Sequence, residues 1–374
     1  MHINSNFDGG NIHCIRSDDA SDIQLEIVKD NQSDFYQWFY FRLTGAEGQD
    51  CSLKIVNATG AAYEEAWSDY QAVASYDREF WFRVPTKYEN GVLQIDHMPE
   101  YQSVYYAFFA PYSMERCADF TAWAIADPKV RLNTLGQTLD GQDLDQLVVG
   151  RESEGKKRIW IHARQHPGET MASWWMEGFV HRLLDEDDAL SRQLLSKAVF
   201  YIVPNMNPDG SYRGHLRTNA TGANLNREWL EPTMEKSPEV FLLRQQMQNI
   251  GVDFCLDVHG DEALPYNFIA GAEGTPGWND NLATLTANFG RAMMKANPDF
   301  QMTHGYPVDA PGSADLSICT NYISETFNCP AITLEMPFKD TADTPQPLQG
   351  WSPERCQTLG RSAIDGLAEV IEGL

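Results

Sequence analysis

The chain has 374 residues, of which 43% are hydrophobic and 11% aromatic, and its 53 acidic and 28 basic residues give a formal net charge of −25. This length predicts two domains with sizeable cores, and the aromatic content argues against a disordered chain. A surface this acidic repels phosphate backbones and anionic lipid, which argues against nucleic acid or a membrane as partner.

The cellular location is predicted from the hydrophobic pattern and the cysteines. No stretch approaches 18 consecutive apolar residues, so no membrane-spanning segment is expected. The first residues, MHINSNFDGG, have neither the basic start nor the apolar core of a secretory signal. The seven cysteines are scattered and form no Cys-x-x-Cys pair, which favours free thiols in a reducing compartment. We therefore expect a cytoplasmic protein, whose oligomeric state the sequence leaves open.

Residues 1–120 are predicted to form an antiparallel β-sandwich. Short apolar or aromatic segments, separated by turn residues and without long helical patterns, are typical of that fold. The predicted strands are 35–43, 52–57, 79–84, 91–96 and 104–109. The run YYAFFAPY, residues 105–112, is the most apolar segment and is interpreted as core packing.

Residues 121–374 are predicted to form an α/β domain with a central mixed sheet flanked by helices. A helix after residue 113 leads to a hairpin, 130–136 and 144–149, that turns at Asp140-Gly141. Buried strands then alternate with helical patterns, which indicates a layered α/β structure. The strands are predicted at 158–163, 198–205, 252–259 and 331–337, and the helices at 168–184, 237–251, 280–297 and 352–373. Ser237 is the predicted N-cap of its helix.

A metal site is predicted from HPGE, residues 166–169, which follows a strand and opens a helix. His166 and Glu169 supply an imidazole and a carboxylate at a sheet edge where α/β folds place their sites. The best third ligand is His259, at the end of the strand VDFCLDVH. Two histidines and a glutamate leave one zinc position open for water, as catalysis requires. The alternative without a metal is an ordinary helix start, at which Glu169 interacts favourably with the helix dipole. The rival ligands are His162, His181 and His215.

Glu335 is the candidate general base. It lies in the apolar strand run AITLEMP, and a carboxylate buried there without a partner is costly. A functional explanation is that Glu335 takes a proton from the attacking water. The alternative is a buried salt bridge.

The segment HLRTNATGANLNREW, residues 215–229, carries basic groups suited to an anionic ligand. Arg217 is a candidate for stabilising an oxyanion. Arg227, next to Asn226, is a candidate for a bidentate clamp on a carboxylate. The alternative is a surface loop with ordinary salt bridges.

Taken in order, these residues resemble the zinc ligands, arginine, Asn-Arg pair and late glutamate of the M14 metallocarboxypeptidases. Further segments resemble hallmarks of the cytosolic carboxypeptidase subgroup, which carries a β-sandwich before its catalytic domain: QWFYFRL at 37–43, YAFFAPYS at 106–113, PNMNPDGS at 204–211 and DVHGD at 257–261. The resemblance implies a carboxypeptidase-like fold for residues 121–374, one Zn²⁺ per chain and hydrolysis of the C-terminal peptide bond of peptides or protein tails.

The same resemblance implies roles for individual residues. Zinc and Glu335 would activate water, and Arg217 would stabilise the oxyanion with the metal. Asn226 and Arg227 would hold the terminal carboxylate of the substrate. Tyr306 is the nearest match, by spacing, to a tyrosine that caps the substrate in pancreatic-type members.

The chain departs from the family pattern at two places. Asn224 stands where many members have an aspartate that orients a zinc histidine, and an amide raises the basicity of the ligand less. Residues 310–317 are the expected wall of the side-chain pocket, and no lysine or arginine occurs between Thr303 and Glu335. A preference for C-terminal glutamate, known among relatives that trim protein tails, is therefore left open.

Two other functions are weighed against a carboxypeptidase. A zinc amidase acting on small N-acyl amino acids would share the ligand plan and the arginine clamp. A non-catalytic zinc-binding protein would keep the fold without the chemistry. The intact set from His166 to Glu335 favours the peptidase over both.

Overall fold

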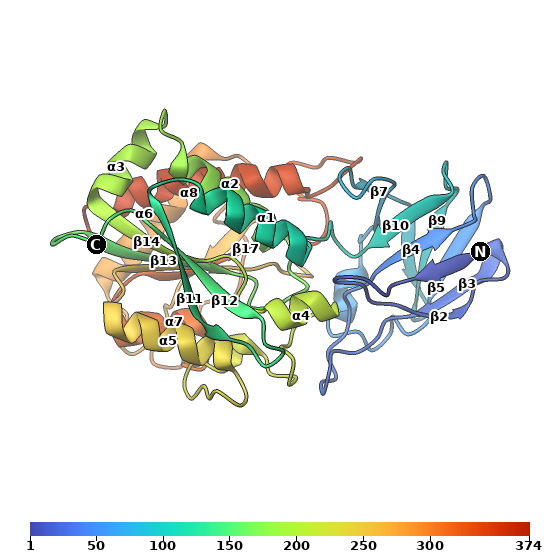
Figure 1. The fold of residues 1–374 in the computed structure, drawn as a ribbon, viewed down its shortest axis with the longest axis horizontal. Helices are drawn as coiled ribbons and strands as arrows, with labels where there is room; N and C mark the ends of the chain where they lie inside the picture. Colours follow the sequence, from blue (N-terminus) through green and yellow to red (C-terminus); the bar gives the residue numbers. More distant parts are fainter.

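Two five-stranded sheets form the N-terminal part of the protein in the computed structural model, which describes all 374 residues. The sheets pack face to face at one end of the elongated molecule (Figure 1). The first sheet has the order β1 (His2–Asn4), β4 (Tyr40–Thr44), β10 (Ser103–Ala107), β6 (Val73–Ser75), β7 (Phe82–Arg83). The second has the order β2 (His13–Arg16), β3 (Ile23–Glu26), β5 (Cys51–Ile55), β9 (Val92–His97), β8 (Thr86–Glu89).

The alternation of side chains explains why these segments form a sandwich. Alternate positions of β5 and β9 are fully buried between the sheets: Leu53, Ile55, Leu93 and Ile95. The strands pair antiparallel with one exception, because β3 and β5 run parallel. The predicted strand at 35–43 is shorter than expected, since only Tyr40–Thr44 pairs as β4. Residues 35–39 instead approach the second domain.

A seven-stranded mixed sheet is the centre of the second domain. Its order is β11 (Val130–Gln137), β12 (Asp143–Val149), β14 (Ala198–Val203), β13 (Lys157–Ala163), β15 (Phe254–Val258), β17 (Ala331–Glu335), β16 (Phe268–Ala270). Strands β14, β13, β15 and β17 run parallel, while the β11–β12 hairpin and β16 add antiparallel edges. This confirms the predicted mixed sheet.

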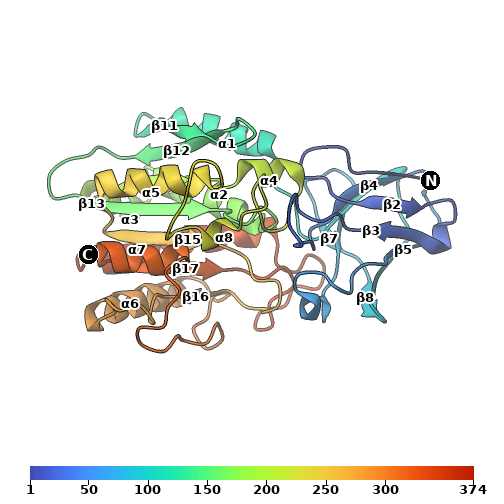
Figure 2. The same ribbon diagram turned by 90° about the horizontal axis from the view of Figure 1, so that it is seen from below.

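Helices cover both faces of this sheet (Figures 1 and 2). One face carries α1 (Met114–Ile125), α2 (Met171–Leu184), α3 (Ala189–Lys197), α6 (Asp280–Ala296) and α8 (Pro353–Val370). The other carries α5 (Pro238–Ile250) and α7 (Cys319–Phe327), and the short α4 (Pro208–Arg213) lies near the sandwich. Three 3₁₀ turns complete the structure, at Ala20–Asp22, Glu64–Trp67 and Leu225–Arg227. None of the helices is both long enough and apolar enough to cross a bilayer.

Helices α2 and α8 approach so closely that their contact requires glycine. A Cβ added to Gly178 would lie 2.0 Å from the carbonyl oxygen of Gln357, and one added to Gly360 would lie 2.1 Å from that of Trp175. We expect Gly178→Ala to lower the free energy of unfolding by about 2 kcal/mol, because the helices must move apart. Urea titration would measure this. Gln193→Ala, on the exposed face of α3, should change it by less than about 0.5 kcal/mol. Equal stability of the two variants would contradict the prediction.

One local prediction differs from the structure. The side chain of Ser237 does not cap α5, because its hydroxyl donates to Glu228 instead (3.4 Å). The domain boundary predicted between residues 120 and 121 falls inside α1 and stays a prediction.

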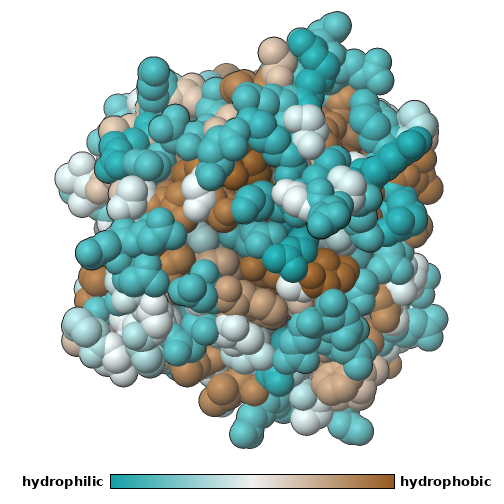
Figure 3. Space-filling model, turned by 90° about the vertical axis from the view of Figure 1, so that its left-hand side faces the viewer, coloured by the Kyte–Doolittle hydropathy of each residue, from teal (hydrophilic) through white to brown (hydrophobic).

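The end of the molecule away from the sandwich is mostly hydrophilic, with small scattered hydrophobic areas (Figure 3).

The carboxyl ends of β13, β15 and β17 point toward the sandwich (Figure 2). His166 follows β13, His259 follows β15, and Glu335 ends β17. The three adjacent strands therefore bring residues that are far apart in the sequence to one sheet edge, at the junction with the N-terminal domain.

Candidate active site

The three predicted metal ligands meet at this sheet edge. Nδ1 of His166 lies 2.6 Å from Oε1 of Glu169, and Nδ1 of His259 lies 2.8 Å from Oε2 of the same carboxylate. The three donor atoms lie within 4.8 Å of one another, and all three side chains are buried. Two nitrogens and a carboxylate in this arrangement form a donor set typical of a catalytic zinc.

The outer nitrogens of both rings indicate that the set fits a cation. Nε2 of His166 lies 3.0 Å from Oδ1 of Asn224, and Nε2 of His259 lies 2.8 Å from Oδ2 of Asp257. An acceptor facing Nε2 favours the tautomer with its proton there, which leaves a lone pair on Nδ1. Burial alone would lower the pKa of His259, but the charges of Asp257 and Glu169 outweigh it and raise this pKa well above its usual value. A metal ion would take the place of the proton between His259 and Glu169. The side chain of Asn224 therefore faces the ring of His166, which is the position that the family resemblance implied for it.

Charge in the site follows from burial and from the neighbouring groups. Burial and the positive charge of Arg217 lower the pKa of His166 to about 4. Burial alone would raise the pKa of Glu169, but His166 and His259 outweigh it and lower this pKa to about 2. A neutral His166 and an ionised Glu169 are the forms that bind metal.

His166 and Glu169 line a cavity of about 510 Å³ that also contains Glu335. Oε1 of Glu335 accepts a hydrogen bond from the hydroxyl of Tyr306 (3.1 Å), which lies 2.7 Å from Asp261 as well. Oε2 of Glu335 is buried and has no hydrogen-bond partner. Burial, reinforced by the charges of Glu169 and Asp261, raises the pKa of Glu335 well above its usual value. The salt-bridge alternative is wrong, since no cationic side chain pairs with this carboxylate.

The cavity also brings together the three residues expected to contact the substrate. Arg217, Asn226 and Arg227 all line it. The Oδ1 atom of Asn226 accepts a hydrogen bond from the backbone of Cys319 (2.9 Å), which fixes the orientation of the amide. Arg227 is exposed at the cavity, where Nη1 donates to its neighbour's carbonyl (2.7 Å). The predicted surface-loop alternative therefore does not describe this segment.

The rival histidines lie elsewhere. His162 is 3.2 Å from both Cys319 and Asp257. His181 stacks on Trp123, and His215 accepts a hydrogen bond from the backbone of Asn31 (3.1 Å). None of the three joins the set at Glu169.

The expected wall of the side-chain pocket is wrong. Residues 310–317 do not line the cavity but lie behind Gly274, which does line it and whose carbonyl accepts a hydrogen bond from the backbone of Ala314 (3.1 Å). The walls come instead from residues 269–274 and 318–321, with Val308 and Asp309. The acidic residues of the cavity were not predicted from the sequence. Asp261 and Glu262 could have been, because they directly follow His259 and Gly260 in the motif DVHGDE and line the same cavity.

Two family models match the chain over separate segments. Residues 3–109 match the cytosolic carboxypeptidase N-terminal domain. Residues 121–355 match zinc carboxypeptidase. The chain belongs to the zinc carboxypeptidase family. It is therefore a metallocarboxypeptidase, a hydrolase of the peptidase class, and zinc is the metal that the family implies.

Relatives of this zinc carboxypeptidase extend the comparison. Cytosolic carboxypeptidase 6 of Mus musculus is 28% identical over 71% of this chain, and the match spans about half, 54%, of that longer relative. A metallo-carboxypeptidase from Burkholderia cenocepacia is 45% identical, with a TM-score of 0.97 and 100% of both chains covered. A metallo-carboxypeptidase from Pseudomonas aeruginosa, solved with (2-guanidinoethylmercapto)succinic acid, is 45% identical, with a TM-score of 0.98 and the same coverage. The predicted resemblance to cytosolic carboxypeptidases is thus confirmed.

Proposed function

We propose that this protein removes the last residue of peptides, with one zinc held by His166, Glu169 and His259. The observation that carries the proposal is that His166 and Glu169 of this donor set line one cavity with Glu335 and Arg227. A metal, a base and a clamp for a terminal carboxylate are the parts that an exopeptidase needs.

Each side chain has a distinct task in this proposal. Zinc, when bound, supplies a Lewis acid at the scissile carbonyl. Glu335 takes a proton from the attacking water and passes it to the leaving amine; its raised pKa suits both steps near neutral pH. Arg217 offers its guanidinium to the negative charge that develops on the carbonyl oxygen.

The position of cleavage is set by the carboxylate clamp. Arg227 is exposed to the cavity and binds the terminal carboxylate, while the amide nitrogen of Asn226 is available as a second donor. Tyr306, whose hydroxyl lies near Glu335, covers the bound residue. Only a chain end places a carboxylate against Arg227, so internal peptide bonds are excluded.

The walls of the pocket favour a terminal residue with a cationic side chain over glutamate. Glu262, Glu273 and Asp309 line the cavity, and its only lysine or arginine residues are Arg217 and Arg227. A Cβ added to Gly271 would lie 2.8 Å from both carboxylate oxygens of Glu273, so this carboxylate lies directly over the pocket wall. The relative from Pseudomonas aeruginosa binds a compound that combines a guanidino group with carboxylates.

Peptides that differ only in their last residue test this specificity. We expect kcat/KM for terminal arginine or lysine to exceed that for glutamate at least 100-fold, because the pocket repels a second carboxylate. Glu273→Gln should reduce the preference about tenfold, roughly 1.4 kcal/mol. The control Glu154→Gln removes an exposed acidic group far from the pocket and should not change it. A preference for glutamate would contradict the proposal, and faster turnover of N-acyl amino acids than of peptides would support the amidase.

The free cysteines bear on the expected location of the protein. All seven cysteines are unpaired and five are buried, which supports the predicted cytoplasmic location. Peptide or protein C-termini are the expected partners.

A further inference from the structure

The loop that carries Arg217 is held by the N-terminal sandwich. Asp30, which is 3% exposed, lies between β3 and β4 and accepts three successive backbone hydrogen bonds from this loop. Its Oδ1 accepts from Leu216 (2.7 Å), and its Oδ2 from Arg217 (2.8 Å) and Thr218 (2.9 Å). The hydroxyl of Thr218 adds a fourth bond (3.0 Å). A buried carboxylate with this many donors fixes the backbone of the loop.

Residues next to Asp30 in the sandwich form further contacts with this loop. The backbone nitrogen of Asn31 donates to His215 (3.1 Å), and its side-chain amide donates to the carbonyl of Ala220 (2.6 Å). Two glycines with left-handed backbones flank the contact: a Cβ on Gly214 would lie 2.7 Å from the carbonyl of Gly10, and one on Gly222 2.5 Å from that of Gln32. Both are positions at which the two domains meet backbone to backbone.

The side chain of Arg217 is held by aromatic rings of the same sandwich. Its guanidinium carbon lies 5.6 Å from the ring centre of Phe35 and 5.6 Å from that of Tyr63. No acidic side chain forms an ion pair with it. Gln37 in turn fixes Tyr63, because its side-chain amide donates to the carbonyl of Tyr63 (3.1 Å) and accepts from its nitrogen (2.9 Å). The guanidinium therefore lies within cation–π distance of two rings and has no direct ion-pair partner, although the charges of Glu262 and Glu169 act on it from farther away.

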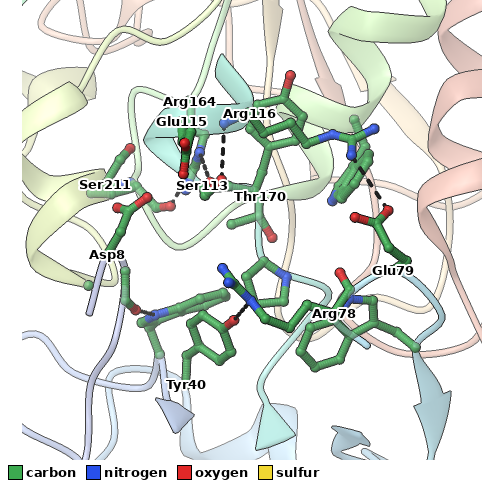
Figure 4. Close-up of a pocket in the computed structure, with 18 of the residues that line it drawn as sticks. Asp8, Tyr40, Arg78, Glu79, Ser113, Glu115, Arg116, Arg164, Thr170 and Ser211 are labelled. Atoms are coloured by element: carbon green, nitrogen blue, oxygen red, sulfur yellow. Dashed lines mark hydrogen bonds and ion pairs between the residues drawn. The ribbon is translucent and has the colours of Figure 1, made fainter. Parts of the chain in front are cut away.

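A second contact keeps the two domains in one orientation. A cavity of about 270 Å³ lies at their junction. Figure 4 shows Glu79 of the sandwich facing Arg116 of α1 on one side of it, and Asp8 on the other side. Oδ2 of Asp8 accepts a hydrogen bond from the backbone of Met114 (2.6 Å), and Nη1 of Arg116 lies 3.8 Å from Glu79. The hydrogen bond to Met114 thus connects the sandwich to α1 at a point separate from the loop of Arg217, and the exposed pair of Arg116 and Glu79 adds little to it.

We propose that the N-terminal sandwich is a working part of the active site, in which Asp30, Phe35 and Tyr63 are positioning residues that aim Arg217 at the scissile carbonyl. The inference rests on the proposed oxyanion role of Arg217. It adds that residues of the N-terminal sandwich set the position of the guanidinium. The sandwich then acts on the rate of the chemical step rather than on the affinity for substrate.

Asp30→Asn tests the backbone grip, because it keeps the size of the side chain and removes its charge. We expect kcat to fall about 100-fold while KM changes less than threefold, since an oxyanion contact is made chiefly in the transition state. Zinc content should stay at the wild-type value. The control is Asp34→Asn in the same segment, which removes an equal charge from an exposed aspartate paired with Lys29. It should retain kcat within twofold.

A double substitution separates positioning from general support of the fold. If Asp30 acts through Arg217, the Asp30→Asn/Arg217→Ala enzyme should be no slower than Arg217→Ala alone. Losses that multiply would overturn the inference. If Arg217→Ala keeps nearly full activity, the oxyanion role itself fails, which is a distinct result.

Tyr63 supplies a second test that does not depend on the buried Asp30. Tyr63→Leu removes the ring that faces Arg217, and kcat should fall at least tenfold with KM little changed. Tyr63→Phe keeps the ring and should restore most of that loss, since the hydroxyl has no hydrogen-bond partner in the structure. Equal activity of the two variants would contradict stacking as the positioning contact.

Discussion

Replacement of Glu335 with glutamine should lower kcat for peptide hydrolysis about 1,000-fold while KM and zinc content change little. The reason is that Glu335 is the carboxylate at the end of β17 whose Oε2 has no partner and whose pKa burial raises. Glutamine keeps the shape and the contact with Tyr306 but cannot accept the proton. Steady-state kinetics with a peptide of the preferred terminal residue would measure the loss.

Two further variants sharpen this test. Glu262→Gln removes another buried carboxylate from the same cavity and should cost less than tenfold, because Glu262 is not assigned a proton-transfer role. Tyr306→Phe removes the hydroxyl that orients Glu335 and should give an intermediate loss. If Glu262→Gln were the more damaging change, the base would have been assigned to the wrong glutamate.

Removal of zinc should abolish activity and lower the melting temperature by roughly 5 °C, since a ligand present at 1,000 times its Kd stabilises the fold by about 4 kcal/mol. Without the metal, His166, Glu169 and His259 leave buried polar atoms that face one another at 2.6 and 2.8 Å. Chelation followed by calorimetry would measure the shift, and added zinc should restore both stability and activity.

Substitution of single histidines identifies the ligand set. His259→Gln should reduce the zinc content, measured by mass spectrometry of the metal, from one per chain to a small fraction. His181→Gln is the matched control, because His181 was a rival in the sequence and stacks on Trp123 instead. It should retain one zinc. A full zinc content in His259→Gln, or its loss in His181→Gln, would refute the assignment.

The fold class was predictable because its signals are local. Strands β13, β15 and β17 are short apolar runs, and burial on both faces of a parallel sheet requires such runs. The short strands β1, β2, β3, β6, β8 and β16 and the helices α3, α4 and α7 were not predicted, because packing rather than a distinct sequence pattern decides them. The residues 35–39 were misread as strand, since their aromatic side chains are typical of a strand although the chain there turns to the second domain.

The proposed metal ligands and the proposed base could be predicted from the sequence, because HPGE, His259 and Glu335 each lie at the end of a recognisable strand, and adjacent parallel strands bring such ends together. The walls of the pocket and the contacts that hold the loop of Arg217 could not be predicted from the sequence. Asp30 looks like any loop aspartate, and nothing near it indicates three amide partners at residues 216–218. Contacts between segments nearly 190 residues apart depend on how two domains dock, and docking is a property of whole surfaces that no local pattern encodes.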